Sequence, residues 1–454
     1  MNGIEKRAIA GVGGIFALRM VGLFMIVPVF SVYGDRYTHA TPLLIGLAVG
    51  IYGLGQAIFQ IPMSLAADKY PRKLMILLGL ILFAAGGILA ATADSIYQVI
   101  IGRALAGSGA VSAVLMALLA DVTREQSRTK AMAAMGLTIA ASIMMAFAIG
   151  PMLVSSLGIS GLFWLTAVFA VLAMVLLMFV PTPLRVLKHN INNKSIAQQM
   201  RDVLVIDDLN RLHIAIFSLH LTMTAIFVIV PHQLADVLNL SVSQQGYVYL
   251  PLLLIGFAIA IPFIIIAEKK QKMRQIFLAA LALMAVSLGV LAFGSQLGAG
   301  LIIGLGLYFV GFNLLEATIP SWISKRAPVA NKATAMGLNS SSQFFGAFIG
   351  GGIGGWLLTQ SSLLSWAILA VVMIISLVLI FPIHQPPYLS STTLSIPKNT
   401  DIVSWSQRIM DIDGVDDIVV MASEQIAYLK LDKHKLTDAA RQQLSQMTET
   451  QLDI

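Results

Sequence analysis

The chain of 454 residues contains no cysteine. This absence excludes disulfide bonds, thiolate metal sites and cysteine nucleophiles, and it leaves the redox compartment open. Charged residues are scarce, because Asp, Glu, Lys and Arg make up only 11% of the chain, about half of their share in soluble domains. Hydrophobic residues make up 57%. The composition therefore excludes an ordinary soluble protein and indicates a membrane protein.

Motifs for enzymatic chemistry are missing as well. The sequence has no Walker loop and no nucleophile with a placed base. We therefore expect no catalytic centre, no cofactor and no metal site. The net charge of +7 comes from basic residues scattered over short loops, a pattern that favours membrane orientation over nucleic-acid binding.

Long apolar runs recur along the whole chain, and a membrane-spanning helix needs about 20 mostly apolar residues. The runs predict twelve transmembrane helices, beginning near residues 9, 43, 74, 96, 130, 160, 211, 244, 275, 298, 332 and 362. The first run follows Lys6 and Arg7 and is longer than the apolar core of a signal peptide, so we expect it to be the first span. The expected body is an all-α membrane protein embedded in a lipid bilayer.

The basic residues between these runs lie almost entirely on one side. Twenty Lys and Arg residues fall on the side of the N-terminus, whereas Arg36 is the single one on the other side. Cytoplasmic loops carry the excess of Lys and Arg in membrane proteins. We therefore predict that both termini are cytoplasmic, in a bacterial inner membrane.

The two halves of the membrane body repeat each other. Ile61, Pro62, Ala67, Asp68 and Lys69 recur as Ile261, Pro262, Ala267, Glu268 and Lys269, and AMGL occurs at 134–137 and again at 335–338. Both repeated motifs have an offset of about 200 residues, which indicates two six-helix halves in parallel orientation. The expected domains are residues 1–181, a cytoplasmic linker at 182–210, and residues 211–387.

Residues 388–454 differ in character, because they carry 6 Lys and Arg against 10 Asp and Glu. Their apolar pattern predicts strand, helix, strand, strand and helix, most of a ferredoxin-like unit with a missing or short fourth strand. We expect a small cytoplasmic α+β domain. Met421 and His434 are poor substitutes for paired cysteine ligands, so a regulatory or ligand-sensing role is favoured over metal transfer.

Charged residues inside the predicted spans are rare and costly, at roughly 2.5 to 3.5 kcal/mol near the bilayer centre. They are Arg19, Arg103 and Glu316. Glu316 is either a partner for a nearby cation or helix end, or a proton carrier whose pKa is raised by desolvation. His220 is a further candidate, although a single histidine is more often a packing residue. We take these four residues as the candidates for proton coupling.

Several uncharged polar residues in the spans are candidates for lining a substrate cavity. Each alone can be a hydrogen-bonding contact between helices, but as a set they indicate a mixed polar and apolar pocket suited to amphiphilic compounds. The candidates are Tyr52, Gln56, Gln60, Asn313, Asn339 and Gln343.

The stretch SLAADKYPRK at residues 64–73 places Asp68, Lys69, Arg72 and Lys73 between two apolar runs. By itself the stretch can be a cytoplasmic anchor. Its spacing resembles the loop signature of the major facilitator superfamily, with Ser64 and Pro71 in place of the two glycines of the signature. The resemblance implies a twelve-helix transporter fold.

Four further runs resemble the YajR subfamily of proton-driven efflux transporters. They are MALLADVTREQSRTKAM (116–132), PFIIIAEKKQKMRQIF (262–277), FNLLEATIPSWISK (312–325) and SSQFFGAFIGGGIGGW (341–356). This subfamily also ends in a cytoplasmic ferredoxin-like unit, the YAM domain. The resemblance implies such a domain at 388–454.

The resemblance also implies roles for particular residues. Asp68 is expected to interact with Arg72 and Asp121 and to face the N-terminus of the span that begins near Lys332, where an anion gains about 0.3 to 1 kcal/mol. This contact would act as a latch that joins the halves when the cytoplasmic side is closed, and would bias the alternating-access equilibrium.

Two more motifs support the resemblance. Arg103 begins RALAGSGAVSA, which is similar to the fourth-span motif of the superfamily and implies a part for Arg103 in proton coupling. Gly150 and Pro151 match a remnant of the antiporter motif, and they can also mark a kink at a close helix crossing.

The sequence thus predicts a proton-coupled antiporter that exports an unknown small, amphiphilic molecule as a monomer. A proton-coupled metabolite importer is the first alternative, because the same Glu316 can serve the opposite direction. A membrane sensor that signals through residues 388–454 is the second alternative.

Overall fold

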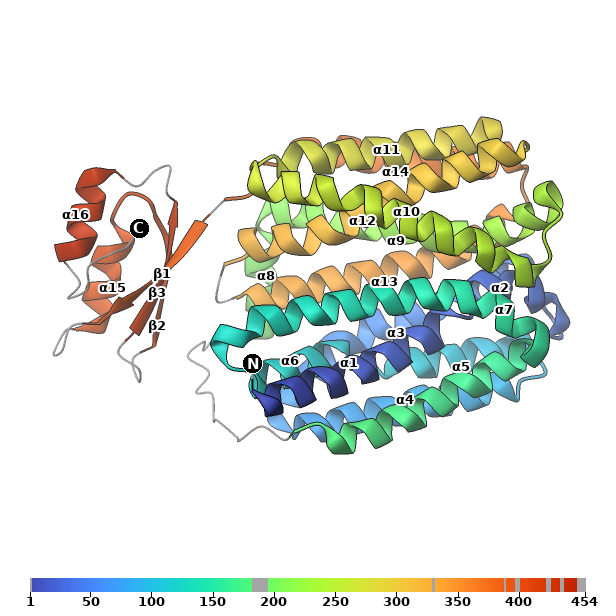
Figure 1. Ribbon diagram of the computed structural model, residues 1–454, viewed down its shortest axis with the longest axis horizontal. Helices are drawn as coiled ribbons and strands as arrows, with labels where there is room; N and C mark the ends of the chain where they lie inside the picture. The colour runs from blue at the N-terminus through green and yellow to red at the C-terminus, as the bar shows by residue number, and fades with distance from the viewer. Residues whose placement is uncertain are drawn as a thin grey trace.

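The computed structural model describes residues 2–181, 195–328, 331–387, 389–396, 401–421, 426–432 and 437–446. Figure 1 shows a bundle of long helices lying side by side, with a small unit of strands and helices beyond one end. The first part of the bundle contains α1 (Gly3–Phe24), α2 (Val27–Tyr33), the short 3₁₀ helix η1 (Gly34–Arg36), α3 (Pro42–Lys69), α4 (Arg72–Ala91), α5 (Ile96–Ser108), α6 (Ser112–Val122) and α7 (Glu125–Phe179). The second part contains α8 (Ile196–Leu204), α9 (Asp207–Leu238), α10 (Val242–Lys269), α11 (Met273–Gly294), α12 (Gly298–Arg326), α13 (Lys332–Leu357) and α14 (Ser362–Ile380).

Ten helical stretches in the described ranges are long and apolar enough to cross a membrane. Two differences separate this number from the twelve expected spans. The fifth and sixth expected spans form the single helix α7, which Gly158 interrupts with a φ of 66°. The eleventh expected span is α13, whose many glycine, serine and other polar residues leave it outside the ten. The exact number of spans stays a prediction.

Helix starts follow local capping. The side chains of Thr41, Ser95 and Ser361 accept hydrogen bonds from backbone amides three residues further on. Helix α1 begins at Gly3, earlier than expected, because Asn2 and Glu5 form a capping box.

The expected linker 182–210 is partly helical, which the sequence analysis did not predict. Its second part forms the amphipathic helix α8, and α9 already begins at Asp207 instead of near residue 211. Residues 182–194 lie outside the described residues.

The two halves meet where α3 crosses α13, and glycines make the crossing close. A Cβ atom built on Gly46 would lie 2.2 Å from the carbonyl oxygen of Gly351, and one built on Gly351 would lie 2.5 Å from the carbonyl oxygen of Gly46. Real Cβ atoms do not approach backbone so closely. Side chains at these positions would therefore force the two helices apart.

Gly150, singled out in the sequence, and Gly350 of α13 also lie at close crossings. A Cβ on Gly150 would lie 2.1 Å from the carbonyl oxygen of Met25, at the break between α1 and α2. A Cβ on Gly350 would lie 2.1 Å from the carbonyl oxygen of Leu221 in α9. Close helix packing explains both glycines.

One end of the bundle, which we call the basic end, carries Lys69, Arg72, Arg124 and Arg326 at helix termini. Among the described side chains, two hydrogen-bonding contacts between the halves lie at the opposite end and near the middle of α3. At the opposite end His232 Nε2 lies 3.2 Å from the carbonyl oxygen of Ser31. Near the middle, Ser341 Oγ donates to the carbonyl oxygen of Ala57 at 3.3 Å.

The C-terminal unit follows the predicted element order. It contains β1 (Leu389–Ser395), α15 (Ile402–Met410), β2 (Val415–Met421), β3 (Ile426–Asp432) and α16 (Asp438–Gln446). The antiparallel sheet has the order β1-β3-β2, so β3 lies between the two strands that α15 connects. Leu394, Trp405, Ile409, Leu429 and Leu444 form its core. The residues after α16, where a short fourth strand could lie, fall outside the described residues, as does His434.

Candidate functional site

Three polar side chains from three helices of the second half converge on one another. They are His220 of α9, Glu316 of α12 and Gln343 of α13. Gln343 Nε2 lies 2.8 Å from His220 Nε2 and 3.3 Å from Glu316 Oε1. His220 Nε2 lies 3.6 Å from Glu316 Oε2. Helix packing therefore joins residues that lie 27 to 123 positions apart into one polar chain.

The hydrogen bonds of His220 fix where its first proton lies. His220 Nδ1 lies 3.2 Å from the carbonyl oxygen of Ile216, which can only accept a hydrogen bond. Nδ1 must therefore carry a proton, and Nε2 of the neutral ring accepts from the Gln343 amide. A second proton on Nε2 would face Glu316 Oε2. The arrangement can hold one proton on either the imidazole or the carboxylate.

Burial differs between these two groups. The side chain of His220 is 7% exposed, whereas that of Glu316 is 39% exposed. Glu316 Oε2 itself is buried and has no hydrogen-bond partner among the described residues. The carboxylate thus lies between a buried imidazole and accessible surface.

The first half contains a network around the buried Arg19. Its guanidinium donates to the carbonyl oxygen of Gly109 at 3.0 Å, and to Ser112 Oγ and Tyr52 Oη at 3.2 Å each. Gln56 donates to the same Tyr52 hydroxyl at 2.9 Å. Two residues expected to line a cavity therefore belong to the surroundings of Arg19.

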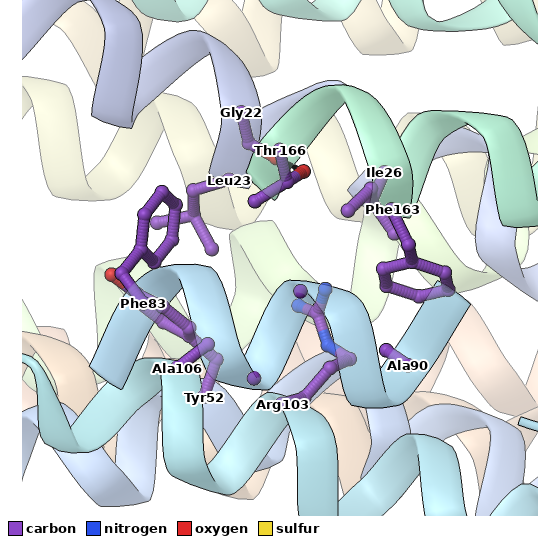
Figure 2. A pocket seen from close by; sticks show the side chains of 12 residues that line it. Gly22, Leu23, Ile26, Tyr52, Phe83, Ala90, Arg103, Ala106, Phe163 and Thr166 are labelled. Atoms are coloured by element: carbon purple, nitrogen blue, oxygen red, sulfur yellow. Dashed lines mark hydrogen bonds between the residues drawn. The ribbon is translucent and has the colours of Figure 1, made fainter. Parts of the chain in front are cut away.

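Arg103 is also buried in the first half, at 4% exposure. Its Nη2 donates to the carbonyl oxygen of Val49 at 3.0 Å. Figure 2 shows its guanidinium pointing into a small cavity between the helices. The ion pairs among the described residues include neither Arg103 nor Arg19.

The remaining cavity candidates do not gather into one group. Asn313 donates to the carbonyl oxygen of Phe309 in its own helix, at 2.7 Å. Gln60 and Asn339 are 3% and 4% exposed, and their side-chain oxygens have no hydrogen-bond partner within the described part of the chain. Gln343 bridges the two candidate proton carriers, and its expected place in a substrate cavity stays a prediction.

Two of the three expected latch residues lie together at the basic end. Arg72 Nε, at the start of α4, lies 2.6 Å from Asp121 Oδ2 in α6. Asp68 is in the last turn of α3, and its side chain lies outside the described ones. Its expected contact with α13 therefore remains a prediction.

The first turn of α13 receives polar contacts from α8. Thr334 Oγ1 donates to Gln199 Oε1 at 3.0 Å, and Asn331 Nδ2 lies 3.4 Å from Asp202 Oδ2. The linker thus brings a carboxylate to the helix end where Asp68 was expected.

Two buried acids at the basic end were missed in the sequence. Glu5 of α1 accepts from Arg124 Nε at 2.9 Å. Asp208 of α9 accepts from Arg326 Nε at 3.1 Å and lies 3.2 Å from His384 Nδ1. In both pairs the acid lies in the first helix of its half; Arg124 directly precedes α7 and Arg326 is the last residue of α12. The repeat offset of about 200 relates one pair to the other and could have revealed them.

Comparisons with known proteins agree with this architecture. The sequence profile of the Major Facilitator Superfamily matches residues 12–338 and 212–411. The Inner membrane transport protein YajR of Escherichia coli (strain K12) is 41% identical over 435 residues, which cover 94% of each chain. An uncharacterized transporter of Buchnera aphidicola is 35% identical over 352 residues, which cover 77% of this chain and 90% of the relative. A solved structure of a bacterial homologue of the human lysosomal transporter Spinster matches with a TM-score of 0.67 at 12% identity, over 84% of this chain and 97% of that one.

Proposed function

From the premise that the chain belongs to the major facilitator superfamily, and is therefore a multi-pass membrane transporter and not an enzyme, we propose that it exports a small molecule in exchange for protons. The match to the superfamily profile confirms the superfamily that the sequence predicts. The 41% identity to YajR over nearly the whole chain supports the predicted subfamily.

The chain of His220, Gln343 and Glu316 carries this proposal. Glu316 is proposed as the carboxyl that binds the transported proton, because it adjoins both accessible surface and a buried imidazole. His220 is proposed to accept that proton on Nε2 when it leaves the carboxylate. Gln343 holds the two groups within 3.6 Å of each other. Arg19 and Arg103 are proposed to act from the first half, as cations that influence the protonation of this site.

Alternating access is proposed to occur at the crossing of α3 and α13. The glycine contacts of α3 with α13 lie toward the end opposite the basic end, so a rocking movement of these two helices is proposed to open and close the basic end. The pair Arg72 and Asp121, together with Asp68, is proposed to stabilise the conformation closed at that end.

The proposed topology has twelve spans, with both termini in the cytoplasm of a bacterium and the body in its inner membrane. The excess of basic residues at one end supports this orientation, and the printed name of the 41% identical relative places that protein in an inner membrane. The C-terminal unit is proposed to be a YAM-like, ferredoxin-like domain, because two strands joined through α15 flank β3. The transporter is proposed to work as a monomer.

Transport assays in everted membrane vesicles test the proposal. A panel of compounds is used, because the assay then does not require one identified substrate. Amphiphilic fluorescent compounds are added one at a time after respiration has acidified the vesicle lumen, and a pH-sensitive dye reports the proton gradient. An exported substrate of a proton antiporter should partly dissipate that gradient. We expect at least one compound to do so in wild-type vesicles, and none in vesicles with Glu316→Gln.

The matched control is Glu268→Gln, because Glu268 has the same side-chain exposure of 39% but pairs with Lys325 at the basic end. This variant should still respond. A wild-type response that Glu316→Gln retains would exclude Glu316 as the coupling carboxyl. Proton entry into the lumen that accompanies substrate entry in the same direction would indicate a symporter and contradict antiport.

A further inference from the structure

Aromatic side chains from both halves meet in the interior of the bundle. Phe147 of α7 and Phe227 of α9 stack with their ring centroids 4.1 Å apart and an angle of 26° between the ring planes. Phe147 belongs to the first half and Phe227 to the second, and the two residues are 2% and 1% exposed. The stack is therefore a buried contact across the boundary between the halves.

Further rings surround the stack on both sides of this boundary. Phe24 of α1 meets Phe147 edge-on, with 5.6 Å between the ring centroids. In the second half, the centroids of Tyr249 of α10 and Phe309 of α12 lie 5.6 and 6.1 Å from that of Phe227. Aromatic rings attract one another at such separations. These five residues, which we call the aromatic cluster, thus come from five different helices.

The aromatic cluster lies between the proposed proton site and the end of the bundle opposite the basic end. Helix α9 begins at the basic end, and Phe227 follows His220 by seven residues, which is about 10 Å along the helix axis. Helix α12 runs in the other direction, and Phe309 precedes Glu316 by seven residues. On both helices the aromatic residue is therefore displaced from the proton site in the same direction.

Close backbone contacts flank the stack. A Cβ atom built on Gly246 of α10 would lie 2.4 Å from the carbonyl oxygen of Ala148, the neighbour of Phe147 in α7. One turn further along α7, a Cβ atom on Gly150 would lie 2.1 Å from the carbonyl oxygen of Met25. Because these backbones leave no room for a side chain between them, a path past Phe147 opens only when the rings or the helices separate.

A constriction of this kind can close a path without any charge, because closely spaced apolar walls exclude water and ions. An exchanger needs such a closure. A continuous path of water past its proton site would let protons cross the membrane without substrate. Since the two stacked rings belong to different halves, a separation of the halves at this end pulls the rings apart. The stack is therefore placed to open and close with the alternation of the halves.

We propose that Phe147 and Phe227 form an aromatic gate, which closes the transport path between the proton site and the end opposite the basic end. The gate is closed when the rings stack, and it opens when the halves separate at that end. This inference rests on the proposed function, because it names the residues that close one side during alternating access.

The reaction of a single cysteine with a thiol reagent tests the gate, because the chain has no native cysteine. Asn313→Cys places this reporter at a partly exposed position of α12, between Phe309 and Glu316. A charged methanethiosulfonate that does not cross membranes is the reagent. In the proposed topology, spheroplasts expose the end opposite the basic end to the reagent, and everted vesicles expose the basic end. We expect the reporter to react slowly in spheroplasts and rapidly in everted vesicles.

Removal of either ring should open the gate. In the reporter background, Phe147→Ala should raise the labelling rate in spheroplasts at least about fivefold and leave the rate in everted vesicles within about twofold, since labelling follows the fraction of molecules with an open path. Phe227→Ala removes the other ring and should give the same result, which provides a second variant if the first accumulates poorly in membranes.

Phe277→Ala is the matched control. The ring of Phe277 is 0% exposed and meets Trp322 edge-on at 5.1 Å, but both residues lie within the second half. The control variant therefore also loses a buried aromatic ring, and it should change neither labelling rate.

Unchanged labelling in spheroplasts for both gate variants would overturn the proposal, as would a reporter that reacts from neither side. A rise in spheroplasts that is matched by an equal fall in everted vesicles would also overturn it, because the rings would then only shift the conformational equilibrium. An equal rise in Phe277→Ala would show a general loosening of the bundle instead of a gate. Labelling requires neither substrate nor a proton gradient, so a failure of the gate is distinguishable from a failure of proton exchange.

Discussion

At the scale of residues, Asp208 shows how a buried acid organises the basic end. The side chain is 3% exposed, and its two oxygens accept from Arg211 at 3.2 Å and from Arg326 at 3.1 Å. Asp208→Asn removes the anion but keeps the shape, so two arginines lose their counter-charge. We expect the variant to lose about 1 to 3 kcal/mol of stability, the usual worth of hydrogen bonds to charged groups. The fall in the thermal unfolding temperature in detergent measures this loss.

Asp207→Asn is the control for that experiment, because Asp207 is the exposed neighbour in the same first turn of α9. Its effect should be close to zero. A double-mutant cycle with Arg326→Gln isolates the pair. Additive effects of Asp208→Asn and Arg326→Gln would show that the two side chains do not stabilise each other.

The residues of the proton site illustrate what a sequence can and cannot reveal. Glu316 and His220 stand out in the sequence because polar groups are costly in apolar spans. The sequence predicts Gln343 as a cavity residue, but it did not predict the bridge, because helical periodicity shows which face a residue occupies but not which helix it meets. The bridge from Gln343 to both groups depends on the packing of α9, α12 and α13. Such contacts between distant segments could not be predicted from spacing.

At the scale of elements, hydropathy predicted most helices well. The expected starts at 96, 298, 332 and 362 coincide with those of α5, α12, α13 and α14. Linker helix α8 was missed because it is short and polar, so the search for long apolar runs could not detect it. The close crossing of α3 and α13 was also beyond the sequence, since glycine repeats indicate close packing without naming the partner helix.

The glycine crossing gives a prediction about the movement of α3 against α13. Gly351→Val places side-chain atoms where a Cβ would already lie 2.5 Å from the carbonyl oxygen of Gly46. We expect this variant to separate the halves at the end opposite the basic end. Because the chain has no native cysteine, the pair Ser31→Cys and His232→Cys can report the separation through a short thiol cross-linker. The cross-linking yield should fall at least about fivefold, which corresponds to roughly 1 kcal/mol in the conformational equilibrium.

Gly352→Val is a closely matched control, because a Cβ on this neighbouring glycine of α13 meets no atom within 4 Å. Both variants carry the same cost of valine in a helix. Equal yields in Gly351→Val and Gly352→Val would contradict the view that the glycine contact holds this end closed.

At the scale of the whole molecule, the C-terminal unit and the helical bundle have separate hydrophobic cores. Within the described part of the chain, the core of the unit consists of residues between Leu394 and Leu444. The chain segment before it belongs to the bundle, because Arg274 donates to the carbonyl oxygens of Phe381 and Ile383 at 2.9 and 2.6 Å. A boundary near residue 387, as predicted from the change in charge, thus leaves each part with its own contacts.

Two truncations use this boundary to separate a transporter from a sensor. Ending the chain after Pro387 preserves the Arg274 contacts, so we expect a folded protein whose substrate-driven proton movement stays within about twofold of wild type, a change below roughly 0.5 kcal/mol in the barrier. Ending it after Ile380 removes the carbonyl partners of Arg274 and should lower the unfolding temperature. The vesicle assay measures transport, and thermal unfolding in detergent measures folding. A folded protein that ends after Pro387 but has lost all proton movement would contradict an independent transport body and favour signalling through the C-terminal unit.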